Sequence, residues 1–124
     1  MRIAIVLSLA LSALPVAVNS HHSTTLNFSD ETITIEGQIK SVLWVNPHCS
    51  FILEVTNEAG IVEEWLIEML ARIALERQGF DFEALEVGEV VTVTGRVGYR
   101  PNSLYLEEAA LQDGMRLTNP GPIR

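Results

Sequence analysis

Three histidines and one cysteine are the residues of this sequence best suited to chemistry, and they fall in two short segments. His21 and His22 follow an apolar leader, whereas His48 and Cys49 follow a proline further along the chain. Imidazole nitrogens and thiolates bind copper and zinc in proteins. The residue types therefore predict a metal site, provided that the fold brings the two segments together.

The apolar leader has the pattern of a secretory signal peptide. A short positive start precedes residues 3–18, which are almost wholly apolar, and Val18 and Ser20 stand at the −3 and −1 positions of a signal peptidase site. The apolar stretch is too short to cross a membrane, and no basic flank follows it. We expect residues 1–20 to be removed, which leaves residues 21–124 as a periplasmic or secreted protein with no membrane span.

Cleavage after Ser20 would make His21 the first residue of the exported protein. Its α-amine and imidazole would then form a chelate suited to Cu(II), and His22 could add a second imidazole and the intervening amide nitrogen. Cleavage two residues earlier would place His21 third, which is also a strong copper chelate. The alternative is a solvated terminus whose histidines contact nothing.

The second segment lies in a bend between two predicted strands. A rigid turn can position a side chain well, so His48 could complete a three-histidine set. Alternatively, its ring bonds a neighbouring carbonyl and stabilises the turn. Cys49 could be an auxiliary ligand or a small buried residue, because free cysteine packs as a hydrophobe. A single cysteine excludes a disulfide framework and a CxxCH haem-attachment motif.

Composition excludes several classes of partner and of enzyme. The formal net charge is −8, and loss of a leader with one arginine would make it −9. Nucleic acid and anionic lipid are poor partners for such a chain, because phosphate binding needs clustered Lys and Arg. The sequence has no Gly-rich phosphate loop, no HExxH motif and no marked carboxylate pair, so nothing in it indicates an enzyme.

The elements that must position these residues follow from the hydrophobic periodicity. Alternating patterns predict strands, and a change to helical spacing predicts one helix, in the order strand 31–45, strand 50–56, strand 61–68, helix 69–78, a short helical turn within 80–85, strand 90–99 and strand 104–111. Gly37 indicates a bulge or sharp bend. This order predicts a mainly β fold, a small five-stranded OB-like barrel with one helix between strands three and four. An open sheet with one covering helix is the alternative. We expect one domain over residues 21–124, with short flexible termini.

Several short motifs resemble an uncharacterised family of small exported bacterial proteins. They are His21-His22-Ser23 after the leader, Trp44-Val45-Asn46-Pro47-His48, and Trp65 in the third strand. The resemblance implies export and a small β-barrel, but no established activity. This chain has Thr24-Thr25-Leu26-Asn27 where aromatic and small residues are typical. It also has Cys49 in place of Ala or Ser, a soft ligand that would favour Cu(I).

Two functions follow as hypotheses. The first is a periplasmic protein that binds copper through His21, His22 and His48, with Cys49 as an auxiliary ligand. The second is a binding module without metal, which would hold a peptide, a glycan or a protein partner of the cell envelope. Trp44 and Trp65 could then form an aromatic ligand-binding platform, although large aromatic residues of small barrels usually belong to the core.

Overall fold

The computed structural model describes residues 27–119, which form one β-sheet structure around one core. Its elements in chain order are β1 (Phe28–Leu43), β2 (Ser50–Thr56), β3 (Val62–Glu68), α1 (Arg72–Arg77), a 3-10 turn (Phe82–Ala84), β4 (Val90–Gly98), β5 (Ser103–Leu111) and β6 (Arg116–Thr118). The mainly β fold and the helix between the third and fourth strands are therefore confirmed.

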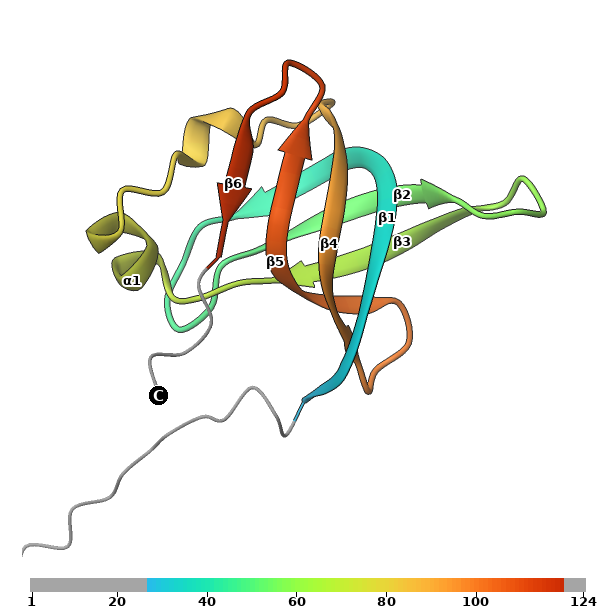
Figure 1. Cartoon of the computed structure of the whole chain (residues 1–124), viewed down its shortest axis with the longest axis horizontal. Helices are drawn as coiled ribbons and strands as arrows, with labels where there is room; N and C mark the ends of the chain where they lie inside the picture. Colours follow the sequence, from blue (N-terminus) through green and yellow to red (C-terminus); the bar gives the residue numbers. More distant parts are fainter. Residues whose placement is uncertain (1–26, 120–124) are drawn as a thin grey trace, which may run out of the picture.

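Pairing of β3, at one edge of the sheet, with β5, next to the other edge, bends the sheet into a ring (Figure 1). The strand order is β3-β2-β1-β4-β5-β6, and β3 also pairs with β5 in parallel, through Leu66 and Ser103 at the start of the ladder. A sixth strand, β6, adds to β5 where a tail was expected. The open-sheet alternative is wrong for the described residues, because the β3–β5 pairing joins the two sides of the sheet.

β1 is long because it belongs to two sides of the ring. Its first part pairs with β4 as far as Gln38, and its last part pairs with β2 from Gln38 onward. Gly37 lies at this change of partner, and β1 curls sharply between its two parts (Figure 1). The register irregularity falls between Ile39 and Ser41 rather than at the glycine. Gly37 instead permits close approach of the β2 backbone at Glu54.

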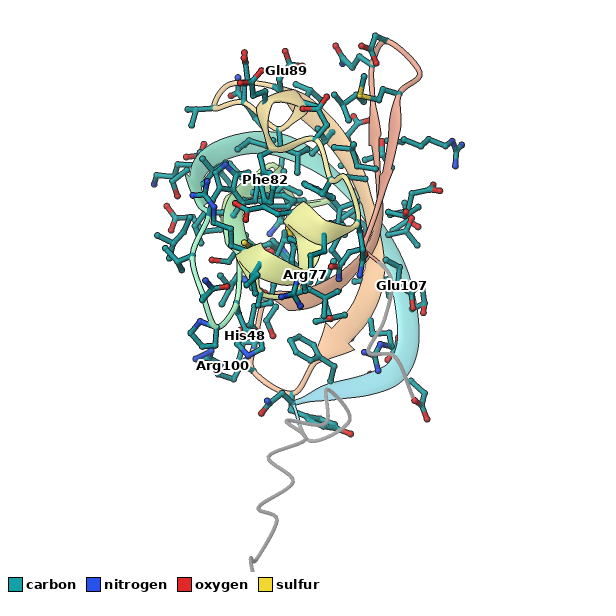
Figure 2. The ribbon with its side chains drawn as sticks, turned by 90° about the vertical axis from the view of Figure 1, so that its left-hand side faces the viewer. His48, Arg77, Phe82, Glu89, Arg100 and Glu107 are labelled. Atoms are coloured by element: carbon teal, nitrogen blue, oxygen red, sulfur yellow. The ribbon has the colours of Figure 1, made fainter. Side chains whose placement is uncertain are left out.

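The core fills the inside of the ring and consists of the apolar side chains that point inward at alternate positions of each strand. Leu53 and Ile67 project into it from the neighbouring strands β2 and β3, and Leu104 and Leu106 come from β5; all four are fully buried. Helix α1 covers one end of the ring and inserts Leu75 (Figures 1 and 2). The interior is therefore occupied by side chains and leaves chemistry to the strand ends and loops.

The helix is shorter than its pattern predicted, and local chemistry explains its ends. Ala71 precedes it without a side-chain cap, and Arg72 and Glu76 form an i,i+4 ion pair on its exposed side. Gly79 adopts a φ of 74° and donates its N–H to the Glu76 carbonyl, which ends the helix as expected.

Candidate functional site

Hydrogen bonds connect the bend that carries His48 to the beginning of α1. Asn46 accepts a hydrogen bond from the Ile73 backbone N–H through Oδ1, at 3.2 Å. Arg72 donates its backbone N–H to the Val45 carbonyl at 3.3 Å and its Nη1 to the Trp44 carbonyl at 3.2 Å. These bonds position the bend and leave the His48 side chain exposed at its surface (Figure 2).

Cys49 points the other way, into the core. Its side chain is fully buried, and its thiol donates to the Val45 carbonyl with an Sγ–O distance of 3.4 Å. Burial raises the pKa of the Cys49 thiol, and the Val45 hydrogen bond and the Arg72 charge only partly oppose this. A neutral buried thiol is a poor metal ligand, since metals bind the thiolate. The structure thus matches the packing interpretation of Cys49.

Both tryptophans are half-buried and belong to the core. Trp44 contacts the edges of the Phe80 and Phe82 rings, with centroids 6.5 and 5.2 Å away, beneath the segment that follows α1. Trp65 lies opposite Leu53 in the β2–β3 ladder. Its Nε1 is enclosed and has no hydrogen-bond partner within the described part of the chain. Both rings therefore pack against the core and keep part of their surface exposed.

The N-terminal histidines His21 and His22 lie outside the described residues, but the point where their segment joins the ring is described. Asn27 precedes β1, and its carbonyl accepts the Tyr99 N–H at 2.9 Å. A cavity of about 180 Å³ opens beside it, lined by Asn27, Glu68, Tyr99, Arg100 and Ser103. Loops and strand ends that are far apart in the sequence therefore meet at this end of the ring.

Glu68 connects this cavity to the His48 bend. It is the last residue of β3 and pairs with Ser50, two residues after His48. In Figure 1 the His48 bend lies at the lower left, near α1, and β1 begins further to the right. Glu68 is the residue between them, because it pairs with Ser50 and also lines the cavity beside Asn27.

Sequence reasoning missed the residues of this cavity. Glu64 and Glu68 alternate onto the same face of β3, and Glu64 is exposed there and ion-paired with Lys40. The neighbours of Glu68 come instead from the parallel β3–β5 pairing, which places Tyr105 beside it. The hydrophobic periodicity of one strand does not indicate which distant strand will pair with it, and these two strands are 35 or more residues apart. The sequence therefore could not predict this cavity.

Comparison with known proteins places the chain in a family. A family of unknown function, DUF6152, matches residues 8–103. The chain belongs to this family. None of the curated proteins matches the sequence. Membership in DUF6152 agrees with the resemblance to an uncharacterised family and supplies no activity.

Two further findings concern metal binding and membrane insertion by the described residues. Between residues 27 and 119, no cluster of three or more His, Cys, Asp or Glu side chains is arranged to hold a metal ion. In the same part of the chain, no helix is long and apolar enough to cross a membrane.

Proposed function

We propose that this protein is exported to the periplasm or secreted, and that its mature form binds copper. His21 supplies its α-amine and imidazole, His22 is an auxiliary ligand, and His48 supplies a further imidazole. The observation that supports this proposal is the position of Asn27, through which the N-terminal segment joins the ring. Asn27 lines a cavity with Glu68, and Glu68 pairs with Ser50, two residues after the exposed His48.

Chain length is compatible with such a site. Six residue steps separate His21 from Asn27, and an extended chain of that length spans roughly 20 Å. His48 is exposed, so its imidazole is free of the packing that holds Cys49. Two histidines and a terminal amine form a nitrogen-rich ligand set, which favours Cu(II) over the hard cations Mg²⁺ and Ca²⁺.

The ring supports a more specific fold proposal, namely that residues 21–124 form a single OB-like barrel after removal of residues 1–20. Three features support the barrel: β1 pairs with both β2 and β4, β3 pairs with β5 in parallel, and α1 lies between β3 and β4 in the sequence. Many unrelated ligands bind to this architecture, so the fold does not select the function.

The test is a Cu(II) titration of the exported protein by calorimetry and EPR, after mass spectrometry of its N-terminus. We expect one tight equivalent that is lost both in His48→Ala and in a version extended by residues before His21. His48 is exposed, so its substitution leaves the core intact. Gln112→Ala is the matched control, since Gln112 is exposed in the β5–β6 turn at the other end of the ring.

Other results would contradict the proposal. Loss of binding on extension of the terminus, with full affinity in His48→Ala, would mean an isolated terminal chelate. No binding in the wild-type protein would retire the metal function altogether.

A second candidate, a binding module for an envelope protein, is favoured by one observation. Val45 and Ile73 are 39% and 49% exposed, and the hydrogen bonds between the bend and α1 hold them close together. Exposed apolar side chains of this kind suit a protein contact. Pull-down of an envelope partner that is lost in Val45→Ser but retained in His48→Ala would support this candidate over copper.

A further inference from the structure

The cavity beside Asn27 is lined by one negative and one positive residue. Glu68 comes from the end of β3 and Arg100 from the β4–β5 turn, and the volume between them is about 180 Å³. Neither side chain forms an ion pair with any residue between 27 and 119, where the ion pairs involve other side chains. Two opposite charges thus share one cavity, and the described part of the chain supplies no counter-charge in contact with either.

Backbone hydrogen bonds fix the walls of this cavity. The β4–β5 turn lies beside the start of β1 (Figure 1), and the Tyr99 N–H donates to the Asn27 carbonyl at 2.9 Å. The Leu66 N–H of β3 donates to the Asn102 carbonyl of the same turn at 2.9 Å. The turn that carries the positive charge is therefore held against both β1 and β3, and β3 carries the negative charge.

Uncharged polar groups complete the lining. Ser103 is only 3% exposed, and its hydroxyl donates to the Arg100 carbonyl at 2.7 Å, which leaves the Oγ lone pairs available to accept a hydrogen bond. The Asn27 side chain adds an amide donor and acceptor. Glu68 is half-buried, so water and salt screen its charge less than on an open surface. The cavity thus offers acceptors for an ammonium group and donors for a carboxylate.

We propose that this cavity binds a short-chain α-amino acid in its zwitterionic form. The ammonium group bonds the Glu68 carboxylate and the Ser103 hydroxyl, and the carboxylate bonds the guanidinium of Arg100, whose planar fork matches it. Since a water molecule occupies about 30 Å³ in the liquid, the cavity holds on the order of six non-hydrogen atoms, which is the size of alanine. This site is separate from the proposed copper function, because His48 does not line the cavity.

The experiment is a calorimetric titration of the full exported protein with L-alanine. Metal is removed first, because the nitrogen and oxygen atoms of an amino acid themselves bind Cu(II). We expect one saturable equivalent. Propionate lacks the ammonium group and ethylamine lacks the carboxylate, so each should bind at least about tenfold more weakly, since each loses a charge-assisted hydrogen bond.

Two variants that each remove one charge locate the site. Glu68→Gln and Arg100→Gln should each weaken L-alanine binding at least about tenfold. Glu107→Gln and Arg77→Gln are the matched controls and should bind like the wild-type protein, because both side chains are exposed and neither lines the cavity (Figure 2). Far-UV circular dichroism checks that all four variants fold.

Three results would overturn this proposal. They are the absence of saturable L-alanine binding in the wild-type protein, equal affinity for propionate or ethylamine, and wild-type affinity in Glu68→Gln or Arg100→Gln. His48→Ala should bind L-alanine normally, so the amino-acid site and the copper function fail separately. Loss of L-alanine binding in His48→Ala would contradict the placement of the ligand in this cavity.

Discussion

Replacement of Gly37 by alanine tests how the ring is closed around β1. Gly37 lies where β1 passes from its pairing with β4 to its pairing with β2. A Cβ at this position would lie 2.3 Å from the carbonyl oxygen of Glu54 and 2.9 Å from Cγ of Leu53. The oxygen belongs to the backbone of β2, so no side-chain rotation relieves the clash.

Two opposing effects determine the magnitude. Insertion of a methyl group into a closely packed site costs typically about 1–3 kcal/mol. Replacement of glycine also reduces the freedom of the unfolded chain, which stabilises the fold by about 0.4–1 kcal/mol. We expect the clash to dominate, with a net loss of about 1–2 kcal/mol in the free energy of unfolding.

The assay is urea unfolding followed by tryptophan fluorescence, since Trp44 and Trp65 both contact the core. With an m-value of roughly 1–3 kcal/mol/M, the midpoint should fall by about 0.3–2 M. Gly60→Asn is the control: Gly60 has a φ of 77°, which asparagine tolerates, and a Cβ there meets nothing within 4 Å. Equal or greater stability of Gly37→Ala would refute the close approach of β2 to Gly37.

Two further predictions concern the core. Leu104 is fully buried inside the ring, and Leu104→Ala should lower the free energy of unfolding by about 2–5 kcal/mol, measured by urea unfolding; a loss below about 1 kcal/mol would contradict its central position. Burial raises the pKa of Cys49 above its ordinary 9.0, so the folded protein retains the thiol proton after the unfolded chain has lost it. The contribution of the protonated Cys49 thiol to the free energy of unfolding should therefore be complete below pH 9.0 and fall as the pH rises from there towards the folded pKa. Cys49→Ala should show a flatter dependence of stability on pH. Identical profiles in the two proteins would contradict the buried thiol.

Local patterns predicted most of the strands well. The strand from Ser50 to Thr56 has the predicted bounds, because its alternation is unbroken and turn residues flank it. The sequence did not predict the short strand β6, because three residues are too few to show an alternating pattern. Its pairing depends on β5, where Ala109 is one of its partners. The helix was predicted about four residues too long, because Met69 continues the apolar pattern while its backbone still pairs with Cys49.

The candidate site was predicted in part. His48 was placed correctly in a bend, because Asn46-Pro47 interrupts the strand pattern. The choice between ligand and core for Cys49 depended on which way the chain turns after the bend, and the sequence left it open. Glu68 was not singled out, because its neighbours Asn27 and Arg100 in the cavity come from other parts of the chain.

The sequence by itself thus determined the elements and the residue types available for chemistry, because hydrophobic alternation and turn residues act over a few neighbouring positions. Only the tertiary structure decided which of them meet. The parallel pairing of β3 with β5 closes the ring and brings Glu68 to the cavity beside Asn27. That contact depends on strands more than thirty residues apart, and its free energy comes from the burial of side chains such as Leu104 inside the ring.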